Sequence, residues 1–412
     1  MPPTPATDVF VARQPIFDAR QRVFAYELLF RSRPETHFSP APGPDAPASH
    51  VISNGMFVGL GNLTDRKPAF INFSRQVLVG DLPFGLPPKQ VVVAITEAVE
   101  PEEQVLAACR KLKAAGYRLA LDHSVEGPSR QPLVDLADFL KVDISAVGSA
   151  ESASIAQKYR DSRHRTVARR VDTREAMAEA AAQGFQLFQG YFFSRPAATA
   201  APKSIPGFRL NYLRLLQELN RPEVDIRRLE QVIKQEASIT FRLLRRVNSA
   251  AYGFRLETSA LRHALVLLGE REIRLCATVW ALADLARDLP SELVVASTLR
   301  ARLCELLAAG AQLADRSMDL FLLGMFSMLD AILEQPIAQI VPTLPLAADV
   351  CEALLGQPNR LRALLDCVTA YERGLWDQVH GLAERAGVPE HLIPTNYLEA
   401  VEWTQEIFQS AA

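Results

Sequence analysis

The sequence predicts an α/β domain followed by an all-α helical bundle, and three observations support this multidomain fold class. The first two hundred residues alternate short β-rich runs with helical runs. A stretch without periodicity, RPAATAAPKSIPG at 195–207, comes next, and helical periodicity takes over beyond it. A chain of 412 residues is also too long for one ordinary core. We therefore expect two domains, at 1–197 and 208–412, joined by a linker at 198–207.

Eight β-rich runs mark the strands of the first domain. Several are unbroken apolar runs, which is typical of strands covered on both faces. Helical segments such as 101–116 and 173–184 lie between them, and the second has a Thr start and a Gly stop. This alternation predicts a mostly parallel sheet, closed or open. The runs are 8–17, 23–30, 69–74, 91–96, 118–122, 139–144, 166–171 and 187–193.

The remaining segments predict one long loop and a series of helices. Residues 31–55 are rich in Pro, Ser, Ala and Gly and predict a long surface loop. In the second domain we expect helices over 226–235, 238–253 and 261–269. The apolar window 318–333 is too short and too interrupted by acidic residues to span a bilayer, so we expect a buried helix there.

The composition excludes some classes of protein. Lys and Arg number 45 against 47 Asp and Glu, so the chain as a whole does not attract nucleic acid or anionic membrane. Its five scattered cysteines contain no CxxC pair, which predicts reduced thiols. The N-terminus lacks the basic start and apolar run of a secretory signal. We therefore expect a cytoplasmic protein.

One acidic residue stands inside an apolar strand-like run, RVFAYELLFR at 22–31. The period-two alternation puts Glu27 on the same face as Val23 and Ala25. A carboxylate buried in such a place needs a cation or several hydrogen-bond donors as partners. Glu27 is thus either a metal ligand or the remnant of a lost active site.

Motifs in chain order extend this observation. ARQPIFDARQRVFAYELLFR, AFINFS, AITE, LALDH, LKVD and FQGYFFSRP follow the order and approximate spacing of an EAL domain, the phosphodiesterase module acting on cyclic di-GMP. The resemblance covers about 8–197. In the second half, SITFRLLRRVNSAAYG followed by LRHALVLLG resembles an HDOD domain, a non-catalytic relative of HD phosphohydrolases. The pairing is similar to EAL–HDOD two-domain signalling proteins, and it implies a (β/α)8 barrel with its site at the strand C-termini.

The resemblance also implies which residues form the site. Active EAL domains hold two divalent cations with carboxylates and an Asn, and use a further Glu as general base. Matched position by position, Glu27, Asn72, Asp122 and Lys141 fit the family pattern. Gln14, Arg31, Asn72, Arg169 and Gln189 fit a set of candidate nucleotide contacts.

Three positions depart from the pattern. Ala94 replaces a ligand Glu, His123 replaces the second Asp of a pair, and Arg169 replaces the general base. A guanidinium cannot deprotonate water, because its pKa is above about 12. From these departures we expect a degenerate, inactive phosphodiesterase-like domain without metal or other cofactor.

Arg169 leaves two alternatives open. It pairs with Glu27 or Asp122 across the old metal site, or it substitutes for a metal by binding a phosphate with its two-pronged guanidinium. In the first case the nucleotide site is closed by an internal ion pair, and in the second it remains.

The second domain also lacks expected metal ligands. Ser327-Met328 stands where the His-Asp pair of HD phosphohydrolases would lie, and His263 is isolated on a helix. Five arginines lie between 242 and 262, either as a solvated helix face or as a docking patch for an acidic partner or nucleic acid. They are Arg242, Arg245, Arg246, Arg255 and Arg262.

The predicted function is a catalytically inactive adaptor in cyclic di-GMP signalling that acts through other signalling proteins. The alternative is a receptor that binds cyclic di-GMP without hydrolysing it. Neither nucleic acid nor a membrane is an expected partner, and a homodimer is left open.

Overall fold

The chain divides into two compact units. The structure, a computed structural model, describes residues 9–32, 60–80, 82–122, 129–194, 212, 215–219, 226–248 and 261–411. The barrel unit comprises Met1–Arg195, Cys367–Leu382 and Pro389–Leu398, and the helical unit comprises the remaining segments. The predicted domain boundaries stay a prediction. The predicted linker and, from residue 33 onward, the predicted 31–55 loop lie outside the described residues.

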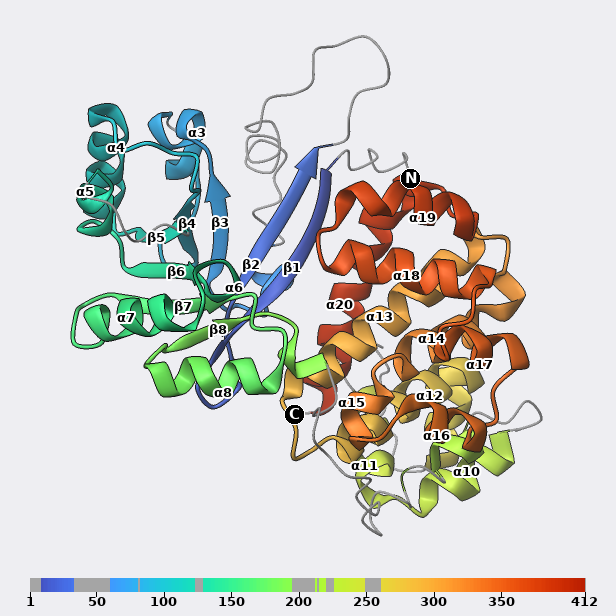
Figure 1. Ribbon diagram of the computed structural model, residues 1–412. Coiled ribbons are helices and arrows are strands. Elements are labelled where there is room, and N and C mark those ends of the chain that lie inside the picture. The colour runs from blue at the N-terminus through green and yellow to red at the C-terminus, as the bar shows by residue number, and fades with distance from the viewer. Residues whose placement is uncertain are drawn as a thin grey trace. The chain divides into compact units, whose positions relative to one another are not determined.

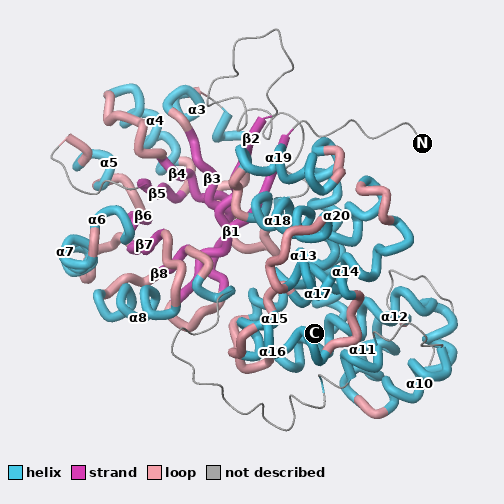
Figure 2. Tube along the Cα trace, turned by 45° about the vertical axis from the view of Figure 1, so that its right-hand side comes forward, coloured by secondary structure: helices cyan, strands magenta, loops and turns pink. Residues whose placement is uncertain are grey.

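Eight strands form a closed barrel in chain order, as Figures 1 and 2 show. Neighbouring strands from β2 to β8 are parallel, whereas β1 runs antiparallel to both β2 and β8. The predicted α/β class is confirmed, and the sheet is the closed form. The strands are β1 Val9–Asp18, β2 Val23–Ser32, β3 Ala69–Phe73, β4 Val91–Ile95, β5 Arg118–Asp122, β6 Phe139–Asp143, β7 Arg165–Arg169 and β8 Leu187–Gln189.

The helices of the barrel unit lie between the strands and cover the outside of the sheet (Figure 2). The helix over 173–184 begins and ends as predicted. The Thr173 hydroxyl accepts a hydrogen bond from the Ala176 N–H at 3.1 Å, and Gly184 ends the helix with a φ of 111°. The helices are α2 Leu60–Leu63, α3 Arg75–Val79, α4 Glu103–Ala114, α5 Gln131–Val134, α6 Ile144–Val147, α7 Ser149–Tyr159 and α8 Arg174–Gln183.

The eighth strand is shorter than the predicted run 187–193. The chain turns at Gly190, which lies so close to Val171 that a Cβ would come 2.0 Å from the Val171 carbonyl oxygen. Residues Phe192–Ser194 then form a 3₁₀ turn. Only glycine fits so close an approach between two backbone segments.

An apolar layer fills the middle of the barrel and carries the functional residues above it. Inward-pointing side chains from the eight strands form this layer, and a strand places every second residue on the same face. The residue two positions further toward the mouth is therefore also inward-facing on each strand. The buried cluster consists of Ile16, Ala25, Phe70, Val92, Ala94, Ala120, Phe139, Val167 and Leu187.

The helical unit and the C-terminal segments of the barrel unit consist of helices. The predicted single helix over 318–333 is wrong in one respect, because the chain breaks into α14 and α15 at Ser327 and Met328. Residues Leu320–Phe326 are buried, as expected. The helices are α10 Ile226–Lys234, α11 Ala237–Val247, α12 Leu261–Leu285, α13 Ser291–Gly310, α14 Ser317–Phe326, α15 Leu329–Leu333, α16 Ile337–Ile340, α17 Ala348–Leu354, α18 Arg360–Glu372, α19 Trp376–Ala386 and α20 Ile393–Ala411.

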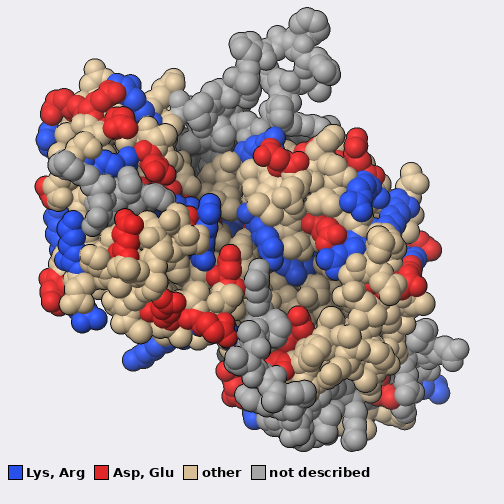
Figure 3. Space-filling model, in the orientation of Figure 1, with Lys and Arg blue, Asp and Glu red and all other residues tan. Residues whose placement is uncertain are grey.

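Three further expectations can be compared with the structure. All five cysteines are free thiols, as predicted. Among the described helices, none has both the length and the apolar content that crossing a membrane requires. On the face shown in Figure 3, basic and acidic side chains are interspersed, in line with the balanced composition.

Close helix packing in the helical unit yields a first prediction. A Cβ on Gly324 of α14 would lie 2.6 Å from the Ala301 Cα of α13, so Gly324→Ala forces the two helices apart. We expect this substitution to destabilise the protein by roughly 1–3 kcal/mol, the usual cost of overpacking. Thermal unfolding followed by circular dichroism measures the effect.

The matched control is Gly381→Ala in α19, where a Cβ meets no atom within 4 Å. Since alanine favours the helical backbone over glycine, this variant should unfold at an equal or higher temperature. Equal melting temperatures for Gly324→Ala and the unmodified protein would contradict the close packing of α13 and α14.

Candidate functional site

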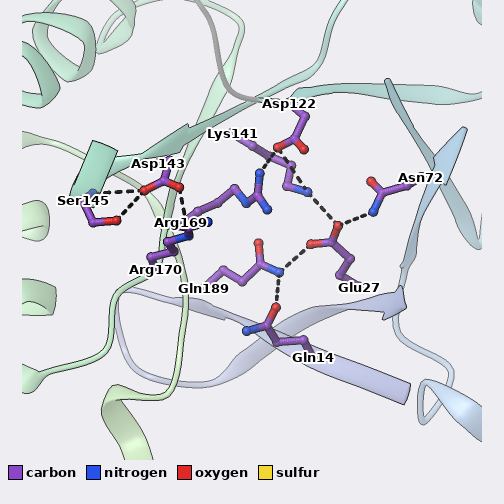
Figure 4. Close-up of polar contacts among 10 residues, drawn as sticks. All are labelled: Gln14, Glu27, Asn72, Asp122, Lys141, Asp143, Ser145, Arg169, Arg170 and Gln189. Atoms are coloured by element: carbon purple, nitrogen blue, oxygen red, sulfur yellow. Dashed lines mark hydrogen bonds and ion pairs between the residues drawn. The ribbon is translucent and has the colours of Figure 1, made fainter. Parts of the chain in front are cut away.

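A polar layer closes the mouth of the barrel directly above its apolar layer. Each strand contributes one inward-facing residue, and Figure 4 shows the polar members converging. Pairing between neighbouring strands sets their heights: Gln14 lies opposite Glu27, Asp122 opposite Lys141, and Arg169 opposite Gln189. The polar members are Gln14, Glu27, Asn72, Asp122, Lys141, Arg169 and Gln189, and the apolar Ala94 holds the position on β4.

Glu27 is the centre of this layer. Its carboxylate accepts hydrogen bonds from Lys141 Nζ at 2.9 Å, Asn72 Nδ2 at 2.9 Å and Gln189 Nε2 at 2.5 Å. The same Gln189 amide donates to Gln14 Oε1 at 2.8 Å. Residues from five strands are thereby joined through one buried carboxylate, which is the set of partners that such a group requires.

Two cations keep Glu27 ionised. Burial by itself would raise the pKa of Glu27, but the Lys141 ammonium, the Arg169 guanidinium and the hydrogen bonds together lower it to about 2. Lys141 is completely buried, and Glu27 is 2% exposed. The pair therefore replaces its water of hydration by direct contacts within the barrel.

Arg169 lies against Asp122 rather than Glu27. Its Nη1 contacts Asp122 Oδ1, and Lys141 Nζ lies 3.7 Å from the same carboxylate oxygen. Of the two predicted alternatives, the structure contains the internal ion pair. The Arg169 side chain remains 26% exposed, so the guanidinium is accessible from the mouth.

Among the described residues, two amide oxygens at the mouth have no hydrogen-bond partner. They are Asn72 Oδ1 and Gln189 Oε1, and both are buried. In Figure 4 the Gln189 oxygen points toward the middle of the cluster. Buried amide oxygens usually accept a hydrogen bond, so these two atoms suit a ligand that carries N–H or O–H groups.

The residues at the mouth do not fit two divalent cations as they are arranged. The Glu27 oxygens are occupied by donors, and Asp122 is paired with Arg169. Ala94 lies beside Asn72 in the strand pairing and offers a methyl group at the third candidate position. Within the described ranges, no three His, Cys, Asp or Glu side chains come together to hold a metal ion. His123 lies outside these ranges.

A second ion pair, which the sequence did not predict, lies next to the polar layer. Arg170 has a left-handed φ of 57°, and its Nε lies 3.0 Å from Asp143 Oδ2. Asp143 also caps α6 by accepting hydrogen bonds from Ser145 and Ala146. Asp143 could have been found, since it follows Lys141 by two residues on one strand face. The conformation of Arg170 has no sequence signal.

Arg31 lies outside the polar layer. Its Nη1 is 3.2 Å from Asp377 Oδ1, and the Asp377 side chain is almost fully exposed. The structure therefore brings together four of the five predicted nucleotide contacts, Arg31 being the exception.

Ser327, at the predicted metal-ligand position of the helical unit, has hydrogen-bond partners within the unit. Ser327 accepts a hydrogen bond from Arg300 Nη1 at 2.8 Å and donates one to the Gly324 carbonyl at 2.7 Å. Burial raises the pKa of nearby Asp330. His263 is exposed.

The arginines of the predicted docking patch differ from one another. Arg242 pairs with Asp284 at 2.9 Å and Arg246 pairs with Glu272 at 2.7 Å. Arg245 and Arg262 are exposed, and Arg255 lies outside the described residues. The patch stays a prediction, now reduced to Arg245 and Arg262 among the described arginines.

The Lys141–Glu27 pair yields a second prediction. Lys141→Met leaves a buried carboxylate without its closest cation, which should cost roughly 3–5 kcal/mol of stability at neutral pH. The double variant Lys141→Met/Glu27→Gln removes both charges and should recover much of that loss. Calorimetric unfolding of the two variants measures the difference, and equal stabilities would argue against the pair.

In Lys141→Met, the pH dependence of the stability that comes from Glu27 should also change sign. In the unmodified protein the pKa of Glu27 is about 2 when folded and 4.5 by default, so its stabilisation is complete above about pH 4.5 and disappears as the pH falls toward 2. This difference corresponds to roughly 3 kcal/mol. In Lys141→Met, burial favours the protonated acid, so acidification from pH 7 to pH 4.5 should stabilise the variant.

The chain is similar to known proteins over nearly all of its length. An HDOD domain model matches residues 205–337 and an EAL domain model matches residues 67–196. The uncharacterized protein YuxH of Bacillus subtilis is 33% identical over 98% of this chain and 99% of its own. The cyclic di-GMP phosphodiesterase CdgJ of Vibrio cholerae is 33% identical over 97% of this chain and 93% of its own.

A solved structure is also similar. It is BlrP1 of Klebsiella pneumoniae in complex with calcium and cyclic di-GMP, with 26% identity and a TM-score of 0.39. The match covers 48% of this chain and 58% of the BlrP1 chain.

The similarity to CdgJ contradicts two predictions. These are that the chain is not an enzyme, and that it is an inactive adaptor or a receptor that does not hydrolyse its ligand. Both were inferred from three single positions, whereas a relative similar over nearly the whole chain is named a phosphodiesterase. Substitutions at Ala94, His123 and Arg169 therefore do not establish inactivity, and two carboxylates and an unpartnered Asn72 oxygen remain at the mouth.

Along the chain, the EAL match comes first and the HDOD match follows. This order agrees with a closed barrel followed by a helical unit, and with the two relatives that are similar over nearly the whole chain. The chain belongs to the family of signalling proteins in which an EAL domain is followed by an HDOD domain.

Proposed function

We propose that this protein acts in cyclic di-GMP signalling through binding of the cyclic dinucleotide at the mouth of its EAL barrel. The observation that carries the proposal is the combination of an accessible guanidinium and two unpartnered amide oxygens in one polar layer. Phosphodiester groups are anionic acceptors that suit a guanidinium, and guanine carries N–H donors that suit amide oxygens.

Binding of a phosphate requires an exchange of ion pairs. The charges of Glu27, Asp122, Lys141 and Arg169 balance as they stand, so an incoming anion competes with Asp122 for Arg169. Lys141 lies 3.7 Å from Asp122 and can keep that carboxylate compensated when the guanidinium turns to the phosphate. The exchange leaves no buried charge without an opposite charge nearby.

The proposal concerns binding, which precedes any cleavage. The named activity of CdgJ supports cyclic di-GMP as the ligand. Hydrolysis of one phosphodiester would convert the cyclic compound into a linear dinucleotide.

Protein partners and a homodimer remain proposals. The described side chains that a partner would meet include two exposed apolar ones in the helical unit, Phe241 at 63% and Val266 at 61%. Each lies four residues from an exposed arginine on the same helix face, Arg245 and Arg262 respectively.

Titration of the full-length protein with cyclic di-GMP by calorimetry tests the proposal. Arg169→Gln removes the charge-assisted hydrogen bond to phosphate, so we expect binding to weaken roughly tenfold to a hundredfold. Arg169→Lys keeps the charge and loses the planar fork, and should fall between the two. The matched control is Arg170→Gln, a neighbouring arginine that pairs with Asp143 and should leave the affinity unchanged.

The same protein variants are also tested for cleavage of cyclic di-GMP. Each is incubated with the nucleotide and Mg²⁺, Mn²⁺ or a chelator, and chromatography measures formation of the linear dinucleotide. The proposal fails if the unmodified protein shows no binding at about 100 μM ligand, equivalent to roughly −5.5 kcal/mol. It also fails if Arg169→Gln and Arg170→Gln bind equally well.

A further inference from the structure

Among the described residues, the β1–β2 hairpin has no helix between its two strands. A tight turn at Asp18–Arg22 joins β1 to β2, so no crossover helix covers this hairpin. β1 pairs with β2 along most of its length, but with β8 only through Ile16–Asp18. The N-terminal half of β1 therefore reaches beyond the end of β8 and needs other partners for its outer edge.

The C-terminal segments of the barrel unit supply these partners. The Val11 N–H donates to the Tyr371 hydroxyl at 3.3 Å, and the Arg13 N–H donates to the Tyr397 hydroxyl at 3.2 Å. Alternate residues of a strand direct their N–H groups to the same edge, so the two tyrosines occupy successive positions along β1. Both tyrosines are completely buried. We call Cys367–Leu382 and Pro389–Leu398 together the C-terminal clasp.

Apolar contacts hold the clasp on the hairpin. The Phe10 ring packs against those of Tyr371 and Trp376, with centroids 6.0 and 5.9 Å apart. Gly374 lies so close to Leu29 of β2 that an added Cβ would be 2.7 Å from its Cδ1. Through these contacts to both strands, the clasp takes the place of a crossover helix on this hairpin.

The clasp also reaches the chain that follows β8. The Tyr191 hydroxyl donates to the Glu372 carbonyl at 3.4 Å, and the Arg373 guanidinium lies 4.8 Å from the centre of the Tyr191 ring. Tyr191 comes two residues after Gln189 of the polar layer. The clasp thus contacts Arg13, next to Gln14, and Tyr191, two residues after Gln189, so it holds both chain segments that meet in the Gln14–Gln189 hydrogen bond.

We propose that the clasp positions the nucleotide site, with Tyr371 and Tyr397 as positioning residues that fix the height of β1 at the barrel mouth. Tyr397 holds the amide of Arg13, and the next residue, Gln14, accepts the Gln189 hydrogen bond that continues to Glu27. The Arg31 side chain on β2 pairs with Asp377 of the clasp. This inference rests on the proposed function, because cyclic di-GMP is the ligand whose binding reports the position.

The clasp lies outside both matched domains, since the HDOD match ends at residue 337 and the EAL match at residue 196. A fragment of the chain that ends at residue 196 would therefore lack the clasp. For this reason the test uses the full-length chain with single hydroxyl deletions.

The variants are Tyr397→Phe and Tyr371→Phe, each of which removes one hydrogen-bond acceptor and keeps the ring. The matched control is Tyr159→Phe in α7, because the Tyr159 hydroxyl is buried and has no hydrogen-bond partner among the described residues. Hydrogen exchange of the β1 amides, measured without nucleotide, tests the clasp itself. Calorimetric titration with cyclic di-GMP, at a temperature where circular dichroism shows each variant fully folded, tests the positioning.

We expect faster exchange at Arg13 and affinity lower by roughly fivefold in Tyr397→Phe, the usual effect of losing one buried hydrogen bond. Tyr371→Phe should act in the same way through Val11, and Tyr159→Phe should change neither quantity. A merely structural role would lower the melting temperature and leave the affinity of the folded protein unchanged, which overturns the positioning role. Unchanged exchange at Val11 and Arg13 overturns the clasp.

The two proposals can fail separately. If the unmodified protein does not bind cyclic di-GMP, the proposed function fails and the positioning role fails with it, whatever the exchange rates. If the unmodified protein binds and both tyrosine variants bind equally well, the proposed function stands and the positioning role is wrong.

Discussion

The buried ion pair between Lys141 and Glu27 is the constraint on which the barrel mouth depends. Neither charge reaches solvent, so each is stable only while the other stays within hydrogen-bond distance. Three further groups follow from that requirement. Asn72 and Gln189 supply the remaining donors to the carboxylate, and Gln14 accepts from Gln189. A displacement of any one of these strands would leave a polar group buried without a partner, so the pair fixes the heights of the strands that meet there.

The period of a β-strand explains why this constraint lies directly above an apolar core. Moving two residues toward the mouth exchanges Ala25 for Glu27 and Phe139 for Lys141 on the same inward face. An arginine then lies at the compared site position in each unit. Arg169 contacts Asp122 at the mouth, and Arg300 contacts Ser327 where the HD resemblance would place a metal ligand. Of the two, Arg169 is the one whose guanidinium remains partly exposed and can meet an anion.

The sequence predicts much of this arrangement and misses what depends on distant contacts. Apolar runs give all eight strands, and the order of motifs brings Glu27, Asn72, Asp122 and Lys141 into one site. Which cation pairs with which carboxylate could not be predicted, because β2 and β6 are 114 residues apart at the Lys141–Glu27 bond and only the closed barrel sets their relative height. The prediction that the chain is not an enzyme was wrong, because it rested on three single positions and left out the similarity of nearly the whole chain to a phosphodiesterase.

The clasp shows the same limit more strongly. Tyr371 and Tyr397 lie in helices with ordinary helical periodicity, and their partners on β1 are more than 350 residues away. Nothing local marks these tyrosines, yet backbone amides at the open edge of β1 need acceptors that β8 is too short to supply. The physical reason for the contact therefore lies in β1, whose backbone needs acceptors, and not in the sequence around the two tyrosines. A strand that extends past its neighbour must find partners elsewhere, and in this family member the C-terminal helices provide them.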